Sequence, residues 1–141
     1  MATTNILRSL EAASIFPRTE EVFIASATIT AGQVVALDYD AGTDAEVMLK
    51  VLPGINSDAT ALDAVGVALE GAAAGERIRV AIAGICEANV STSVSAGDRL
   101  ILSSVSGEYL TFNGTHAFPV LAIALEDDAA GVATVRVFRT F

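Results

Sequence analysis

The sequence predicts an all-β fold: a small β-barrel or sandwich built from two similar halves, with an N-terminal arm or short helix. Along most of the chain, short runs rich in Val, Ile, Leu and Thr alternate with turn residues about every ten positions, as all-β domains do. In ERIRVAI, Ile78, Val80 and Ile82 share one face, as in a half-buried strand. The sequence also contains an internal repeat, with similar segments at 65–84 and 121–140.

The first 21 residues lack this β rhythm. In TTNILRSLEAAS, apolar residues follow helical spacing behind Thr or Asn caps, so a short amphipathic helix and a flexible arm are both open. We therefore divide the chain into residues 1–21, the arm or short helix, and residues 22–141, a single β domain.

Within the β domain, apolar runs and turn residues define the elements in order. Strands are expected at 22–29, 33–39, 46–52, 76–82, 98–104 and 108–112, and around Val135 and Val137. Turns are expected at DAGTD (40–44), SG (106–107) and NG (113–114). The segment 53–64 has no clean periodicity and is expected to be a long loop, with room for one helical turn.

The repeat extends beyond the twice-written phrase. TAGQVVAL (30–37) corresponds to SAGDRLIL (95–102), so the repeated units run from about 30 to 84 and from about 95 to 140. Neither unit can bury an apolar face alone, and we expect the two to fold around a shared core. Alternation and turn spacing suit a barrel and a sandwich equally.

The composition of the chain excludes or disfavours several classes of partner. The 141 residues are most simply one domain, and a single cysteine, Cys86, excludes an intrachain disulfide. No apolar run approaches the roughly 20 residues that cross a bilayer, so no membrane partner is expected. A net charge of −9 with scattered basic residues disfavours nucleic acid. The start lacks a secretory signal, which predicts an intracellular product.

Residue types that carry chemistry are few and separated. His116 stands beside an NG turn, outside any cluster, and Cys86 lies among apolar strand residues. We therefore expect no enzyme, no catalytic residue, no metal site and no cofactor.

Two acidic groups keep an alternative open. The first, within DYDAGTDAE, matches a calcium loop poorly, and the second is LEDDAAG; their acids are Asp38, Asp40, Asp44 and Glu46, and Glu126, Asp127 and Asp128. Solvated turns are the simpler reading of both groups, while a cation or basic-partner site at Glu126–Asp128 stays open.

The segments AGQVVAL, AVGVALEGAAAGERIRVAIAG and AGDRLIL, in a short acidic β domain, resemble the capsid decoration, or cement, proteins of tailed bacteriophages. The resemblance covers about residues 28–137. It implies a compact β-rich body, frequently a homotrimer, on the outside of an expanded phage head, where it clamps neighbouring copies of the major capsid protein. A virion protein of this kind is made in the host cytoplasm.

The resemblance also implies a role for the first residues, because such proteins often attach through an N-terminal arm. The candidate partner-binding residues are Ile6, Leu7, Leu10, Ile15 and Phe16. Two alternatives remain: another virion component, such as a tail or head-fibre β module, and a small-molecule-binding barrel.

Overall fold

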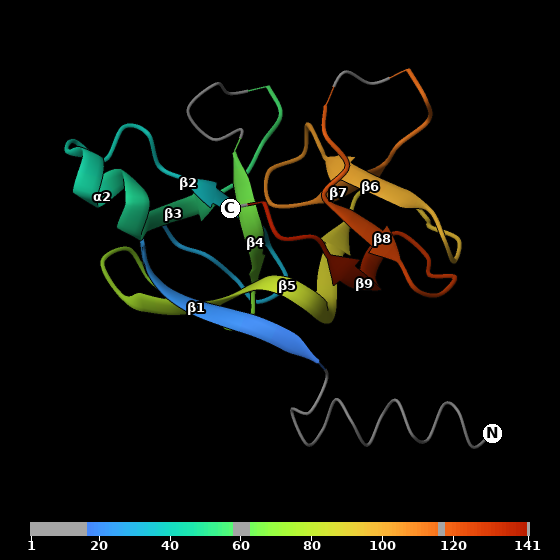
Figure 1. Ribbon diagram of the computed structural model, residues 1–141, viewed down its shortest axis with the longest axis horizontal. Coiled ribbons are helices and arrows are strands. Elements are labelled where there is room, and N and C mark those ends of the chain that lie inside the picture. Colours follow the sequence, from blue (N-terminus) through green and yellow to red (C-terminus); the bar gives the residue numbers. More distant parts are fainter. Residues whose placement is uncertain (1–16, 58–62, 116–117, 141) are drawn as a thin grey trace.

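The structure is a computed structural model that describes residues 17–57, 63–115 and 118–140. It is almost entirely β, which confirms the predicted fold class (Figure 1). The strands are β1 (Arg18–Ala25), β2 (Val34–Leu37), β3 (Lys50–Pro53), β4 (Ala64–Ala68), β5 (Arg77–Val90), β6 (Arg99–Leu102), β7 (Tyr109–Thr111), β8 (Ala122–Ala124) and β9 (Gly131–Val137), and the described helix is α2 (Asp44–Leu49).

The strands form two closed cycles that share β5. The sheet order is β1-β3-β2-β4-β5-β7-β6-β8-β9, and further pairings of β5 with β1 and with β9 bring both ends of this order back to β5. In Figure 1 the first cycle lies at the left and the second at the right, and β5 runs from one into the other. Closure leaves fewer sheet edges that would otherwise need covering.

Gly84 marks the point where β5 changes partners. β1 pairs with β5 up to Gly84, and β9 pairs with it from Gly84 onward. The φ of Gly84 is +94°, in the left-handed region that favours glycine. A Cβ placed there would lie 2.3 Å from the carbonyl oxygen of Pro17 and 2.5 Å from the Cα of Arg18. The crossing from one cycle to the other therefore needs glycine.

The two halves of the sequence make matching hydrogen bonds. Each Ala-Gly turn donates to the strand that carries the Leu-Glu phrase: Gly32 N to Ala68 O and Gly97 N to Ala124 O, both 2.8 Å. Single bridges repeat in the same way, between Ile29 and Ala72 and between Val94 and Asp128. The repeated phrases thus build the same local structure twice.

The buried residues form two clusters. Val35 and Leu37 of β2 pack inside the first cycle, whereas Val34 faces the cluster of the second. All residues of β2 and β4 are buried, because one face of these strands lines the first cycle and the other packs against the second. This two-sided burial explains their continuous apolar runs, which lack the alternation of a half-exposed strand.

The predicted strand at 46–52 is wrong: this segment begins as α2 and becomes β3 only at Lys50. Thr43 caps α2, since its side chain accepts from Glu46 N while Thr43 N donates to the Glu46 carboxylate. This reciprocal pair is a capping box, and its T-x-x-E pattern is readable in the sequence. Residues 40–44, expected as a hairpin turn, instead lead into this helix.

The first predicted strand is shifted. β1 begins at Arg18 and ends at Ala25, whereas the alternating apolar run predicted residues 22–29. Its first four residues are extended because they pair with β5, a contact distant in sequence. Of the predicted loop at 53–64, Pro53 closes β3 and Ala64 opens β4, and residues 58–62 lie outside the described residues.

Candidate functional site

Chemistry-bearing side chains do not assemble into a centre in the part of the chain that the structure describes. No group of three or more His, Cys, Asp or Glu side chains in these ranges could hold a metal ion. His116 lies outside the described residues. Among the described helices, none is long and apolar enough to span a membrane.

Two acids of the 38–46 segment, Asp38 and Glu46, take local structural roles. Asp38 Oδ1 accepts from Asp40 N at 3.0 Å, which fixes the turn after β2. Glu46 belongs to the capping box and pairs with Lys50 at 3.4 Å. Hydrogen bonds from the Thr43 backbone, then from Lys50 and the Thr43 hydroxyl, hold the pKa of Glu46 below its ordinary value.

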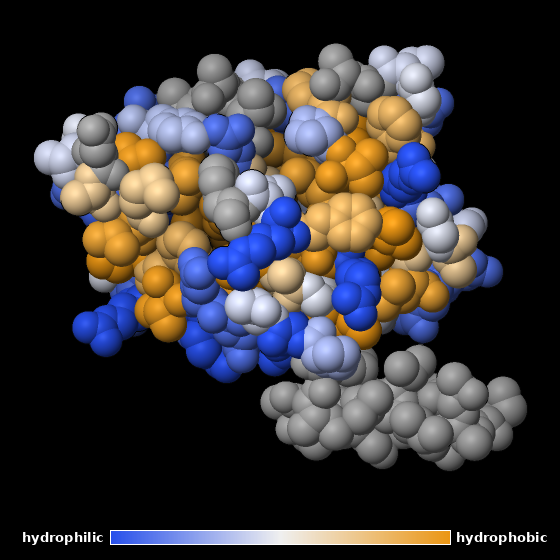
Figure 2. All heavy atoms as spheres, viewed as in Figure 1, coloured by the Kyte–Doolittle hydropathy of each residue, from blue (hydrophilic) through white to orange (hydrophobic). Residues whose placement is uncertain are grey.

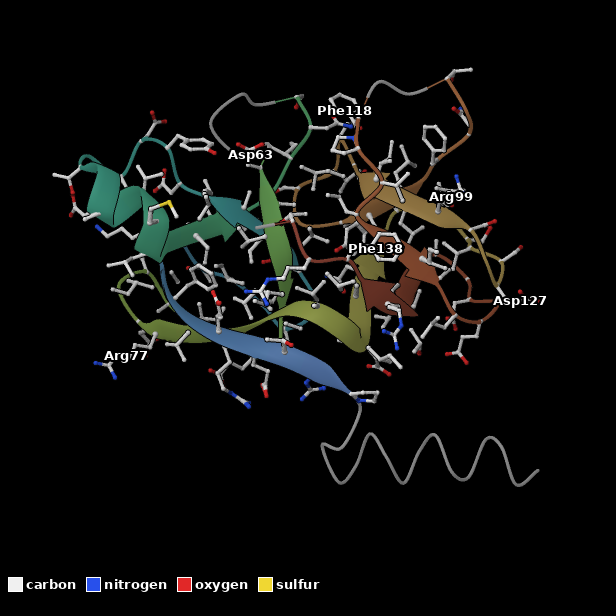
Figure 3. All side chains as sticks on the ribbon, in the orientation of Figure 1. Asp63, Arg77, Arg99, Phe118, Asp127 and Phe138 are labelled. Atoms are coloured by element: carbon white, nitrogen blue, oxygen red, sulfur yellow. The ribbon has the colours of Figure 1, made fainter. Side chains whose placement is uncertain are left out.

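The acidic turn at Glu126–Asp128 is also held by hydrogen bonds. Asp127 Oδ1 accepts from Ala96 N at 2.8 Å, and Glu126 accepts from the Thr134 hydroxyl at 2.7 Å. Asp128 Oδ2 accepts from Thr134 N at 3.3 Å. Figure 3 places Asp127 at the end of the second half, far from α2. These carboxylates tie the turn to its neighbours.

Cys86 is buried at 2 % exposure in the cluster of the second cycle. Burial raises the pKa of its thiol to about 12, so the protonated form persists at neutral pH.

We predict that a thiol reagent at pH 8 labels Cys86 roughly a thousandfold more slowly in the native protein than in denaturant, because the thiolate is the reactive form. Time-resolved labelling followed by mass spectrometry measures both rates. Equal rates would show that the side chain is accessible and contradict its placement in the core.

Large apolar side chains remain exposed on both halves. In the first they gather on β1 and α2, where Val22 is 59 % and Met48 60 % exposed. The complete described set is Val22, Tyr39, Met48, Leu49, Val105, Leu125, Val132 and Phe138. Figure 2 shows apolar side chains over α2 and again over β8 and β9, and Figure 3 places Phe138 beside β9. Exposed apolar surface of this kind is typical of interaction sites.

An apolar cavity of about 190 Å³ opens into the first cycle. Its walls are core side chains from four strands: Phe23, Leu37, Val65 and Ile82. Met48 of α2 lines it with Glu21, Arg139 and Thr140. The Thr140 hydroxyl donates to Ala64 O at 3.0 Å, which holds the end of the described chain beside the cavity.

A second, more polar hollow of about 290 Å³ lies where the two halves meet, lined among others by Arg79, Gly32 and Asn89. Arg79 is held by ion pairs to Glu20 at 3.2 Å and to Glu70 at 3.4 Å. Its guanidinium is thus engaged within the chain.

The predicted partner-binding residues all fall outside the described residues: Ile6, Leu7, Leu10, Ile15 and Phe16. Their role stays a prediction. Sequence reasoning missed the apolar cavity, because its walls come from strands distant in sequence. One local pattern bears on the cavity: the Thr43–Glu46 capping box predicts that a helix begins there, and Met48 of that helix lines the cavity.

These features define the class of the protein: a small all-β domain of two strand cycles with exposed apolar side chains on its surface. A family model described as phage cement protein matches residues 20–138, and the chain belongs to this family. The resemblance found in the sequence is therefore confirmed, and the chain is a virion-associated structural protein of a bacteriophage.

The structural comparison agrees with this fold. The head fiber gp8.5 N base of bacteriophage phi29 superposes with a TM-score of 0.62 at 16% sequence identity, over 87% of this chain and 96% of that chain. At this identity the likeness shows the fold. No curated protein matches the sequence.

Proposed function

We propose that the chain is a decoration protein that binds the outside of the phage head and clamps neighbouring copies of the major capsid protein. The observation that carries this proposal is the family match, which spans both strand cycles from residue 20 to residue 138. The protein acts by binding, without catalysis.

The surface supports this role. Many copies bind one shell, so weak contacts at each copy sum to tight attachment. Exposed Met48 and Leu49 on α2 supply apolar contact area. The carboxylates of Asp38, Asp127 and Glu126 accept hydrogen bonds that hold local structure, which favours a structural over a catalytic role.

We also propose that the protein is a homotrimer. Its mean hydropathy of +0.57 is high for a small domain, and burial of apolar surface between subunits accounts for this excess. Attachment through residues 1–16 completes the proposal and rests on the family resemblance alone.

The test is co-sedimentation of the purified protein with expanded heads that lack it, reading bound copies per shell as protein is added. We expect saturation at a fixed small number per capsomer and greater survival of decorated heads on heating. The mass of the unbound protein, by sedimentation equilibrium, is expected at three times the chain mass of 14.4 kDa. Absence of saturable binding would overturn the proposal, and a monomeric mass would overturn the trimer alone.

A second candidate function is the base of a head fibre, favoured by the likeness to the phi29 head fiber base over 96% of that chain. A fibre base attaches to the head but need not bridge capsid subunits. Saturable binding without a gain in head stability would favour this candidate over cementing.

A further inference from the structure

The pairing of β1 is incomplete along one edge. β1 pairs with β5 from Arg18 to Ile24, but with β3 only at Ile24 and Ala25. Within the described ranges, residues 18–23 therefore have a strand on one side only. The first cycle is closed by a short pairing and is open beside it.

Hydrogen bonds at the end of β1 fix the direction of its backbone groups. Ala25 N donates toward the start of β5, to Glu76 O, and Ser26 N donates to Val51 O of β3. Because N–H groups alternate sides along a strand, those of Glu20 and Val22 point to the open edge. The same edge carries the exposed side chain of Val22, whereas that of Phe23 points into the core.

The apolar cavity borders this open edge. Glu21 and Phe23 of β1 line one side of the cavity, and Leu37 of β2 and Val65 of β4 line the other. An apolar cavity of about 150 Å³ holds a benzene molecule, so about 190 Å³ accommodates one branched or aromatic side chain. The edge thus offers unpaired backbone groups, and the cavity next to it offers space for one side chain of a bound segment.

The second half shows how the equivalent position is filled. By the repeat, Ala88 on β5 and Leu102 on β6 correspond to Phe23 and Leu37, and both are buried with Val34 and Ala64 of the first half. Asn89 corresponds to Ile24, at the end of β1 that pairs with β3, and its backbone N donates to Gly32 O at 2.8 Å. In the second half, buried apolar side chains of the first half thus lie in the same cluster as Ala88.

We propose that the open edge of β1 binds an extended segment of the major capsid protein as an added strand, with one apolar side chain of that segment in the cavity. This inference rests on the proposed function. Unpaired backbone donors and acceptors beside a side-chain socket are the features that strand addition uses.

Charge favours a capsid segment, and not the β1 of a second copy, as the strand that pairs with this edge. Glu20 of β1 is paired with Arg79, but Glu21 is exposed, and pairing β1 with its own copy would bring two Glu21 carboxylates to one edge. The net charge of −9 adds to this repulsion. A segment that carries Lys or Arg beside its apolar anchor is complementary to this edge.

The test compares two substitutions at Val22 in the co-sedimentation assay. Val22→Pro removes an N–H that points to the open edge and leaves the ladder with β5 intact, as proline does on edge strands. Val22→Thr changes the side chain but keeps the N–H. We expect Val22→Pro to weaken head binding at least about tenfold and Val22→Thr to bind as wild type. Equal melting temperatures of the two variants exclude a folding defect.

Hydrogen exchange of wild-type protein on and off the heads gives a second readout. We expect slower exchange in the peptide that spans residues 18–25 when heads are present. Normal binding by Val22→Pro, with no protection of this peptide, would overturn the inference and leave the proposed function standing. Absence of any head binding by the wild-type protein would overturn both the inference and the proposed function. If the peptide 18–25 were already protected without heads because the protein self-associates, a second copy would be the partner of this edge and the inference would be overturned.

Discussion

Replacing Gly84 with Ala is expected to lower the free energy of unfolding by about 3–5 kcal/mol, a large part of the stability of a small domain. The positive φ of +94° costs an L residue about 1–2 kcal/mol. The added Cβ would also lie 2.3 Å from Pro17 O and 2.5 Å from Arg18 Cα, so β1 must move away from β5. Urea unfolding followed by circular dichroism measures the loss.

Gly97→Ala is the matched control for this substitution. Gly97 has φ +90°, but no atom outside its chain neighbours lies within 4 Å of the added Cβ. Gly97→Ala is therefore expected to lower the free energy of unfolding only by the cost of the positive φ, about 1–2 kcal/mol. If the two variants lost equal stability, the close packing of β1 against Gly84 would be refuted.

Replacing Tyr109 with Ala is expected to cost about 3–5 kcal/mol, the range for removal of a large buried aromatic ring. Tyr109 is 1 % exposed, heads the largest fully buried side chains, and joins β5 to β6 through its pairing with Val90 and Leu102. Burial also raises the pKa of its hydroxyl, which therefore stays protonated at neutral pH. Denaturant unfolding of both proteins gives the difference.

Because the two cycles share β5, we expect the Tyr109→Ala variant to unfold in one transition that includes the first half. Tyr39→Ala serves as control: Tyr39 is 44 % exposed, hydrogen-bonded to Asp63, and expected to cost less than about 1.5 kcal/mol. Two separated transitions in the Tyr109→Ala variant would show that the halves fold independently.

Part of this fold was readable from the sequence. The alternation of Ile78, Val80 and Ile82 gave a correct strand, and the twice-written phrases correspond to matching hydrogen bonds. Local patterns sufficed there because the strand is buried on one face and each turn bonds within its own repeat.

Other parts depend on contacts between distant residues. β2 and β4 lose alternation because the second half covers their outer face, and β1 extends back to Arg18 because it pairs with β5. α2 was predicted as part of a strand because residues 46–52 are mostly apolar, and the Thr43–Glu46 capping box was overlooked. The edge of β1 is open because β3 begins only at Lys50, and this is seen only when the pairing of these two distant strands is known.

The shared strand limits how the length of this chain can change over evolution. A residue inserted within β5 would turn every later side chain of the strand to the opposite face, so an insertion near its start would remove inward-facing residues from both cycles. At Gly75 and Gly97 an added Cβ would have no described atom outside its chain neighbours within 4 Å, so these turns tolerate a change of length better than a paired strand does. Related chains are therefore expected to vary in length at these turns and to keep β5 at constant length.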